Sequence, residues 1–528
     1  MPGQRVLCRA MACIMLLALT GCRIPGLCCA NPAPPLPDSF NGLTTAENSA
    51  QVGIIEFFND PPLSRLLIQG LTQNQELNIR NQEIWIASNQ VMAARGAYLP
   101  FLGGTFRGGF ERTSRFTPLG AAEDQLTFPG GGRFPDPLGN MRLTTDLFWQ
   151  IDIWRQLRNA RDAANQRYIA AIEDRNFLIT RLVAEVAENY YELASLDQRL
   201  TFFNQTIELL EQSLENAIAQ KAAARGTELG VQRFLAEVRK NQSQRFIIQQ
   251  RMIEVANRIN FLVGRFPQPV DHTAWNLINL DSRILNVGVP AQFLENRRDI
   301  RAAERELAAA GLDIRVARAR FFPRLIITAG VGYEAFNPKY LFDPGAFIAN
   351  AFGELTAPML NRLAIRADYQ TANARQLQAV YNYQRTVLNA FIEVVNSINK
   401  VQNYGTSLNV KQQQVKALED SVQVARDLFN RPIVEEFARV EYVDVLLATR
   451  DLLEARTALI ETKQQQLSAI VRVYQALGGG FLVTSTGPEF PELFCTPADI
   501  PLDEMLLAPA ADGATTQPAP EALPPPLE

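Results

Sequence analysis

Two very long helical runs constrain this chain more than any other feature of its sequence. Residues 157–224 contain neither proline nor glycine, and a run of matching length covers residues 362–429. At about 1.5 Å per residue, a continuous α-helix of this length reaches about 100 Å. That is several times the width of a small domain, so we expect helices that extend far beyond any compact core.

Apolar residues recur in both runs with the alternating three- and four-residue spacing of a coiled coil. The second run shows this spacing from Val401 to Phe429, where only Lys411 introduces a charge. Turns at residues 225–227 and 430–432 are expected to reverse the runs into helices at about 228–263 and 435–477. We therefore predict two coiled-coil hairpins. The first seam consists of Leu193, Leu196, Leu200, Phe203, Ile207, Leu210, Leu214 and Ala217.

A pair of short strands precedes each long run, so the chain is a tandem repeat. Pro100 and Pro323 hold equivalent positions, because each follows a helix and precedes a strand. Upstream, residues 55–80 are predicted to form one amphipathic helix after the turn at Asp60, and a second helix leads into the first strand. The strands are expected at about 99–110 and 143–152 in the first repeat, and at about 322–333 and 347–356 in the second.

Apolar residues alternate with polar or small residues along all four predicted strands, which is typical of membrane β-barrel strands. Four strands cannot close a barrel alone. Several chains must therefore contribute, or the strands must bury their apolar face elsewhere. Aromatic residues near the strand ends suit a girdle at the membrane surface, and packing inside a sandwich core is the alternative. These residues are Phe110, Trp149, Tyr333 and Phe347.

The first residues have the pattern of a secretory signal. Arg5 and Arg9 precede an apolar segment that ends in Leu19-Thr20-Gly21-Cys22, the pattern of a bacterial lipobox in which Cys22 would carry the lipid. An ordinary signal cleaved near Cys28-Cys29-Ala30, or an uncleaved start, is the alternative. The predicted organisation is a signal peptide at 1–22, a linker at 23–44, a first repeat at 45–263, an inter-repeat region at 264–290, a second repeat at 291–480 and a disordered tail at 481–528.

Nothing in the sequence favours catalysis, a cofactor or a metal. His272 is the only histidine, and no glycine cluster is followed by the lysine of a phosphate-binding loop. A net charge of -4 gives no basic surface for nucleic acid. Five of the six cysteines lie in the first thirty residues, which argues against a disulfide framework.

Five short motifs, in this order on a duplicated frame, resemble the outer-membrane factor family of TolC-like efflux channels, and in particular its lipoprotein branch that works with resistance-nodulation-division pumps. The resemblance covers about residues 45–480. The motifs are Phe57-Phe58-Asn59-Asp60, Arg298-Asp299-Ile300-Arg301-Ala302-Ala303-Glu304, Phe321-Phe322-Pro323, Glu441-Tyr442-Val443-Asp444-Val445-Leu446 and Tyr474-Gln475-Ala476-Leu477-Gly478-Gly479-Gly480.

The resemblance implies a homotrimer in which twelve strands, four from each chain, form one barrel through the outer membrane. A barrel of α-helices continues it across the periplasm, with a lipid anchor at Cys22. The implied partners are a periplasmic membrane-fusion adaptor, an inner-membrane resistance-nodulation-division pump (or an ABC exporter), and membrane lipid.

The resemblance also implies that the hairpin tips form the periplasmic entrance and contact the adaptor. The matching residues of the first tip are Arg225, Gly226, Thr227, Glu228 and Leu229. Two features depart from the family: Gly230 replaces a frequent aspartate, and the second tip is longer than usual. Three copies of an acidic side chain around a narrow pore could select cations, whereas the plain alternative is a solvated helix charge. The candidates are Glu435, Glu436, Glu441 and Asp444.

The function implied by the resemblance is a passive outer-membrane exit channel of a tripartite efflux system, driven by the inner-membrane partner. An outer-membrane duct for type I protein secretion is the alternative within the same fold, and a periplasmic coiled-coil scaffold is the alternative outside it. The lipobox and the motif at 298–304 favour efflux over secretion. The strand alternation favours a channel over a scaffold.

Overall fold

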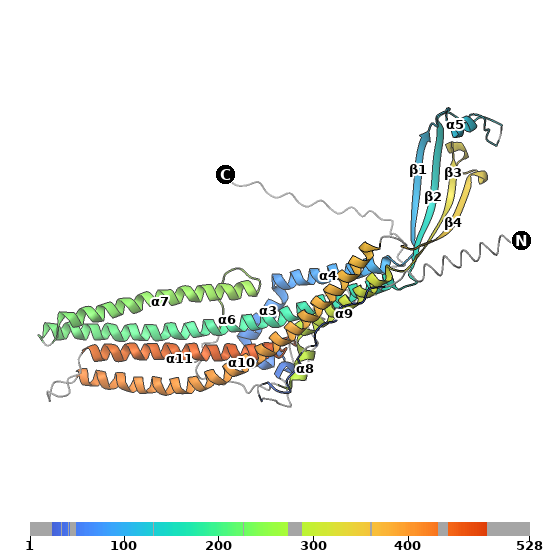
Figure 1. Cartoon of the computed structure of the whole chain (residues 1–528). Coiled ribbons are helices and arrows are strands. Elements are labelled where there is room, and N and C mark those ends of the chain that lie inside the picture. Colours follow the sequence, from blue (N-terminus) through green and yellow to red (C-terminus); the bar gives the residue numbers. More distant parts are fainter. Residues whose placement is uncertain are drawn as a thin grey trace, which may run out of the picture.

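The chain forms a long rod with four β-strands at one end and the tips of two helical hairpins at the other (Figure 1). The computed structural model describes residues 24–32, 34–40, 42, 49–129, 131–224, 226–272, 288–358, 362–430 and 442–482. Several predicted features lie outside these residues. They are the signal peptide with Cys22, Arg225, most of the predicted turn at 430–432, most of the inter-repeat region and nearly all of the C-terminal tail.

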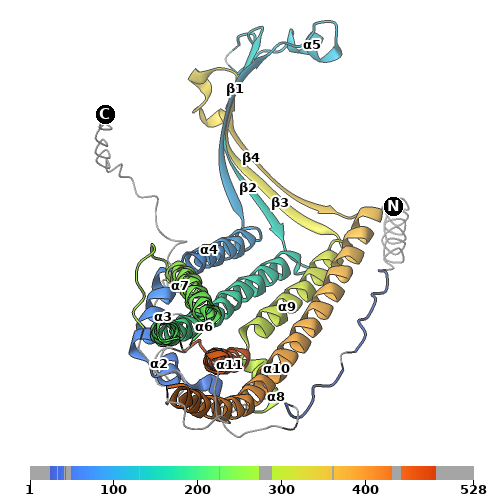
Figure 2. The same ribbon diagram turned by 90° about the vertical axis from the view of Figure 1, so that its left-hand side faces the viewer.

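The four strands form one antiparallel sheet in chain order (Figure 2). They are β1 (Phe101–Glu111), β2 (Leu138–Ile151), β3 (Arg324–Ala335) and β4 (Phe347–Thr356). The pairs β1–β2 and β3–β4 each belong to one repeat, and the pair β2–β3 joins the repeats. The predicted fold class, long helices with four strands per chain, is confirmed.

The register of the sheet places the predicted apolar residues of all four strands on one face. Leu102, Leu147, Ala329 and Ala351 form one row across the strands. Because side chains alternate between faces with a period of two, every second residue along each strand shares that face. On the opposite face, a polar row consists of Arg107, Arg142 and Glu334.

Two helical hairpins make up most of the rod. The first is α6 (Gln156–Ala222) with α7 (Glu228–Leu262), and the second is α10 (Leu363–Asn430) with α11 (Tyr442–Ala476). α6 also packs against α11, which joins the hairpins. Nearer the strands, α4 (Gln75–Gly96) lies beside α6, and α9 (Arg298–Ala319) lies between α6 and α10. The helices therefore form a curved layer whose outer edges are α4 and α7 on one side and α10 on the other (Figure 2).

Both predicted seams lie inside their hairpins. Leu210 and Ala217 of α6 are buried against Phe234 and Val238 of α7. In the second hairpin, the half-buried Lys411 points its ammonium group across the seam, where it donates to the Thr462 hydroxyl at 2.6 Å and to the Ala458 carbonyl at 3.2 Å. A lysine is therefore accommodated because its charge has polar partners on the facing helix.

The largest hydrophobic core lies in the middle of the rod, where short helices pack against the long ones. α2 (Ile54–Phe58) and α3 (Pro61–Gln73) cover α6 and the end of α11. The Phe57 ring stacks on Tyr474 at 3.8 Å between centroids, and the Tyr474 hydroxyl donates to the Val52 carbonyl at 2.6 Å. Burial raises the pKa of this phenol.

The two helices predicted upstream of the first strand are α3, after the turn at Asp60, and α4. At that turn Asn59 takes the left-handed conformation with φ of 46°, and the break between α3 and α4 falls at Asn74, which is extended. The short helix α2 before the turn was not predicted. The Asn74 side chain accepts from Leu77 N at 3.0 Å and donates to the Leu262 carbonyl at 2.8 Å. Asn74 thus begins α4 as an N-cap residue and ties it to α7. β2 also starts earlier than predicted, because Leu138 pairs with Glu111.

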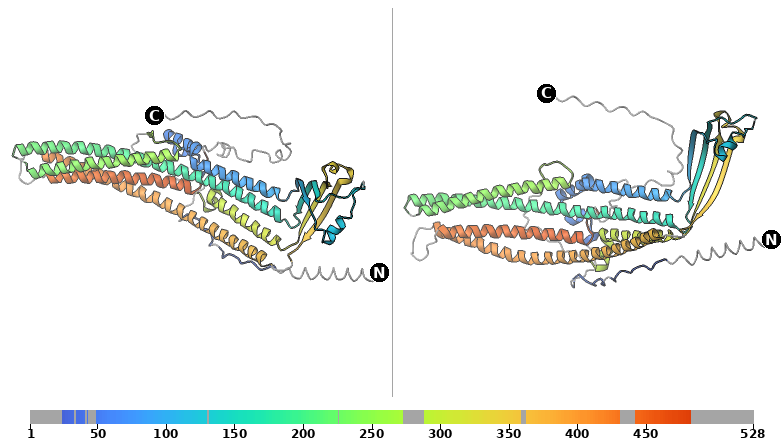
Figure 3. Two further views of the ribbon diagram at one scale, coloured as in Figure 1. Left: turned by 90° about the horizontal axis from the view of Figure 1, so that it is seen from above. Right: turned by 45° about the horizontal axis from the view of Figure 1, so that its top comes forward.

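The N-terminal segment runs along α10 from the strand end toward the middle of the rod (Figure 3). Phe40 is fully buried and stacks on Phe391, and the Asn31 carbonyl accepts from Gln384 at 3.3 Å. α8 (Pro290–Asn296) precedes α9, and α5 (Pro118–Glu123) lies in the loop between β1 and β2. In the part of the chain that the structure describes, no helix is both long and apolar enough to cross a membrane.

Candidate functional site

The tip of the first hairpin is a tight turn at the end of the rod farthest from the strands (Figure 1). Ala224 takes the left-handed conformation with φ of 55°, and the Thr227 hydroxyl accepts from Gly230 N at 3.2 Å to cap α7. A Cβ added at Gly226 would lie 3.1 Å from the Lys221 backbone nitrogen. A larger residue at this position would therefore require the end of α6 to shift by a few tenths of an ångström.

Of the predicted tip residues, Glu228 has partners within its own hairpin, whereas Leu229 is exposed to solvent. The Glu228 carboxylate forms an ion pair with Lys221 of the same hairpin and accepts from Gln232 at 2.6 Å. Both hydrogen bonds lower the pKa of Glu228, the one from Lys221 most. Leu229 leaves 56% of its surface exposed, and Ile218 is also exposed near this tip. The tip thus offers a small apolar surface beside a charge that is already paired.

Of the four acidic residues expected at the entrance, only Asp444 lies in the described part of the chain. It is in the first turn of α11, where a negative charge complements the helix dipole. Two residues later, Leu446 packs against the first hairpin beside Val231. The structure therefore places the start of α11, where Asp444 is exposed, beside the first hairpin, while Glu435, Glu436 and Glu441 lie outside the described residues.

Two ion pairs connect the hairpins away from their tips. The Arg472 guanidinium of α11 donates to both carboxylate oxygens of Glu188 on α6, with Nη2 and Oε2 2.5 Å apart. Arg199 pairs with Glu461 at 3.0 Å. Burial raises the pKa of Glu188, and Arg472 opposes that shift. These pairs were not predicted from the sequence, because their members are hundreds of positions apart.

The motif at residues 298–304 lies where four helices meet. The preceding Arg297 leaves only 5% of its side chain exposed, and it bonds to Asp299 at 2.8 Å, to Glu393 of α10 at 2.9 Å and to the Ala476 carbonyl at 2.9 Å. Burial disfavours its charge, but the two carboxylates outweigh burial and raise the pKa of Arg297. Arg298 and Arg301 both pair with the buried Glu173 of α6, at 3.2 Å and 2.9 Å. The motif therefore joins the repeats to each other.

The apolar face of the sheet is long enough for an outer-membrane barrel. Gly139 of β2 pairs with Phe110, and Trp149, near the helices, lies ten positions further along the strand. At about 3.3 Å per residue this distance is about 33 Å along the strand. A tilt of about 40° reduces it to the apolar height of about 25 Å that is typical of such barrels. Trp149 donates its Nε1–H to the Tyr98 carbonyl at 3.1 Å, which fixes one predicted girdle residue at the helical end of the sheet.

The sequence matches the family model described as outer membrane efflux protein over residues 66–264 and 289–479. The cation efflux system protein CusC of Escherichia coli (strain K12) is 26% identical over 486 residues, which cover 90% of this chain and 99% of that protein. The solvent efflux pump outer membrane protein SrpC of Pseudomonas putida is 28% identical over 447 residues, 81% of this chain and 87% of that protein. The probable outer membrane lipoprotein SilC of Salmonella typhimurium is 24% identical and covers 85% of this chain and 94% of that protein.

Among solved structures, a crystal structure of CusC aligns with 87% of this chain and 99% of its own. The TM-score is 0.74 at 23% identity, so the two chains share one fold.

Replacing Arg472 by Met should weaken the contact between the hairpins more than replacing Glu188 by Gln. Arg472→Met leaves the mostly buried Glu188 carboxylate without its partner, at a cost of about 1 to 2 kcal/mol after discounting for the exposure of Arg472. Glu188→Gln keeps a polar group of the same shape. The measurement is the thermal melting midpoint of each purified variant in detergent at pH 7.5.

The Arg472→Met variant should also recover stability in acid. A carboxyl whose pKa is raised in the folded state binds protons more readily there than in the unfolded state. The loss of folding stability caused by its buried charge therefore decreases as the pH falls through the folded-state pKa. We expect the difference in melting midpoint between Arg472→Met and wild type to be smaller at pH 5.5 than at pH 7.5. A difference that stays constant with pH would contradict the assignment of the cost to the unpaired Glu188.

Lysine substitutions should distinguish the two faces of the sheet. Phe106 lies on the apolar face and its neighbour Thr105 on the opposite face. A lysine that faces lipid near the membrane midplane costs about 2 to 4 kcal/mol. We expect Phe106→Lys and Ile327→Lys to reduce sharply the folded protein recovered in the outer-membrane fraction, and the matched variants Thr105→Lys and Thr328→Lys to insert normally. Equal recovery of both sets would mean that this face does not contact lipid.

Proposed function

Because the chain belongs to the outer membrane efflux protein family, we propose that three copies assemble into one continuous duct through the outer membrane and the periplasm. The chain is the outer-membrane exit channel of an efflux system. We also propose that the chain is divided into a signal peptide at 1–22, a linker at 23–44, repeats at 45–263 and 291–480 with the region 264–290 between them, and a tail at 481–528.

The observation that carries the trimer is the open sheet. Among the described residues, no strand pairs with the outer edge of β1 or of β4. Unpaired backbone N–H and C=O groups cannot remain exposed in lipid, so each edge needs a partner. Pairing β4 of one copy with β1 of the next satisfies both edges. Three copies then close a twelve-stranded barrel, whereas four strands are too few.

The helical part supports the same arrangement. Large apolar side chains are exposed along both edges of the curved layer. An apolar surface of this extent on the edges of a molecule marks a contact with another chain. In a ring of three, the edge of α4 and α7 would lie against α10 of the neighbour. The exposed side chains are Ile79, Ile86, Met92, Phe246, Ile247 and Ile253 on the first edge, and Tyr381, Leu388, Ile392 and Val410 on the second.

The lipid anchor fits this placement. Ile24, two positions after Cys22, packs with Phe321 and Tyr369 beside the start of β3. An acyl chain on Cys22 would therefore enter the membrane at the level where the strands leave it. The chain is an outer-membrane protein, and we propose that it is lipid-anchored at Cys22 and extends into the periplasm.

The hairpin tips are the proposed entrance and adaptor surface. Arg225, Gly226, Thr227, Glu228 and Leu229 would contact a periplasmic adaptor, which connects the duct to an inner-membrane pump of the resistance-nodulation-division class. The exposed Leu229 supports this role. Asp444, with Glu435, Glu436 and Glu441, would surround the entrance with negative charge. The duct conducts passively and has no catalytic role, so the choice of substrate belongs to the pump.

Crosslinking in cells tests the proposed partner. A photoreactive residue at Thr227 should capture a periplasmic adaptor that is encoded with a resistance-nodulation-division pump, as identified by mass spectrometry. The same residue at exposed Gln250, in the middle of α7, is the matched control and should capture far less adaptor. Capture of an adaptor from an ATP-driven protein exporter would reassign the duct to secretion. Capture of no adaptor would contradict the proposed entrance.

The lipid anchor has its own test. Cys22→Ala should leave the fold intact but abolish the mass increase of lipidation and reduce anchoring during assembly, since each buried methylene contributes about 0.8 kcal/mol. The measurement is intact mass together with the amount of trimer assembled in the outer-membrane fraction. Cys28→Ala is the control and should behave as wild type. An unchanged mass in Cys22→Ala would show that Cys22 is not lipidated.

A further inference from the structure

Two polar side chains converge over a glycine on the polar face of the sheet. Gly330 of β3 pairs with Asp146 of β2 on one side and with Asn350 of β4 on the other. A Cβ added at Gly330 would lie 2.7 Å from Asp146 Oδ1 and 3.2 Å from Asn350 Oδ1. The carboxylate and the amide therefore lean from both neighbouring strands into the space that a larger residue at position 330 would fill.

Two phenylalanines stand beside this point on the same face, closer to the helices. Phe148 of β2 and Phe352 of β4 flank Thr328, with which both pair across β3. Phe148 leaves 49% and Phe352 66% of its surface exposed. Two strand spacings of about 4.8 Å attach the rings about 10 Å apart, with the smaller threonine between them. That spacing admits an apolar group above the threonine.

The Asp146 carboxylate has no cationic partner in the part of the chain that the structure describes. Its Oδ2 accepts from the Thr144 hydroxyl at 3.0 Å, and this donor is neutral. The arginine on the same face of β2, Arg142, is attached about 13 Å farther along the strand. An unpaired carboxylate beside exposed aromatic rings attracts a cation, because the faces of the rings are also negative.

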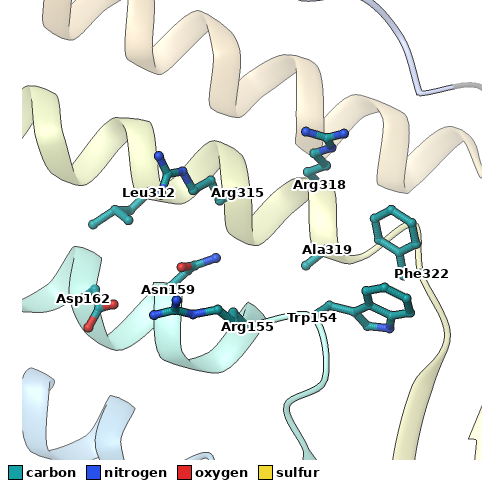
Figure 4. A pocket seen from close by; sticks show the side chains of 9 residues that line it. All are labelled: Trp154, Arg155, Asn159, Asp162, Leu312, Arg315, Arg318, Ala319 and Phe322. Carbon is teal, nitrogen blue, oxygen red and sulfur yellow. The ribbon is translucent and has the colours of Figure 1, made fainter.

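Contacts at the helical end of the sheet fix this register. Trp154 follows β2 and Phe322 precedes β3, and their rings stack at 4.7 Å (Figure 4). The Trp154 Nε1–H also donates to the Pro323 carbonyl at 2.8 Å. A shift of the register by one residue would turn every side chain to the other face. The contact at the strand ends therefore keeps Asp146 opposite Gly330.

We propose that this place binds amphipathic cations as they pass through the barrel. The charged group of the cation would contact the Asp146 carboxylate and the Asn350 carbonyl oxygen above Gly330. Its apolar body would lie between Phe148 and Phe352. These five residues form what we call the β3 site, and a trimer has three such sites. The inference rests on the barrel placement proposed above, which turns this face toward the lumen.

The chemistry of the β3 site favours an organic cation over a metal ion. Calcium takes six to eight oxygen ligands, and magnesium requires a regular octahedron. Only two side-chain oxygens, from Asp146 and Asn350, face the space above Gly330. An organic cation needs fewer acceptors and gains contact with the aromatic rings as well. Such binding must be weak enough for release, so the site would delay a cation without replacing the selection made by the pump.

Binding of ethidium, a planar aromatic cation, tests the β3 site. Purified trimers in phosphatidylcholine nanodiscs are titrated into ethidium, and fluorescence anisotropy is measured against empty nanodiscs. Asp146→Asn keeps the shape of the side chain but removes its charge, and it should weaken binding about fivefold. Phe148→Ala/Phe352→Ala should also weaken it about fivefold, through the lost ring contacts. The matched control Glu334→Gln removes the same charge from the same face and should bind as wild type.

Competition separates the charge from the apolar body. Benzyltrimethylammonium should displace ethidium from wild-type trimers. Tetramethylammonium carries the same charge without the ring, and it should need about fivefold higher concentration. Equal displacement by the two ions would contradict the role of the phenylalanines.

Other results would also overturn the inference. Equal affinity of wild type and either Asp146→Asn or the double phenylalanine variant would place the cation elsewhere. An equal loss in Glu334→Gln would indicate the general negative charge of the lumen. If wild type formed no membrane-inserted trimer, the proposed function would fail and the inference with it. An inserted trimer that binds no ethidium would overturn the inference alone.

Discussion

The outer edges of β1 and β4 impose the main constraint on this molecule. The sheet has one apolar face and, among the described residues, two edges without partner strands. In water such edges would aggregate, and in lipid their backbone groups would have no hydrogen-bond partners. Only closure with further strands satisfies the edges and the apolar face together. The helices continue from the strand ends, so a closed ring of strands forces a ring of helices as well.

Buried ionic contacts hold the repeats in register where the helices meet. Arg297 joins α10 and the end of α11, and Glu173 of α6 receives two arginines from α9. A buried pair contributes little net stability, but breaking one is costly, so such pairs favour one arrangement over others. At this junction they fix how α6, α9, α10 and α11 align. A small error there would be magnified along hairpins whose shorter helices have 35 residues and are about 50 Å long.

The periodicity of apolar residues predicted the helices and strands of this chain well, because it depends only on residues that are near one another in the sequence. The alternation at Leu102 and Leu147 placed both on one face, and the register confirmed it. The exact break between α3 and α4 was harder: Asn74 ends α3 and caps α4 with its side chain, which the apolar spacing does not reveal. Contacts between distant residues, such as Arg472 with Glu188, were beyond sequence reasoning.

The distribution of apolar contacts along the rod separates a fixed part from a part that can move. The middle contains the largest core, which includes Tyr474, Phe57 and the α6 residues around Tyr190. Toward the first tip the core shrinks to a small cluster around Phe234. Local opening is easiest where few apolar contacts must be broken. Motion therefore requires the least free energy at the end proposed as the entrance. The core and the buried arginines keep the rest of the duct in place.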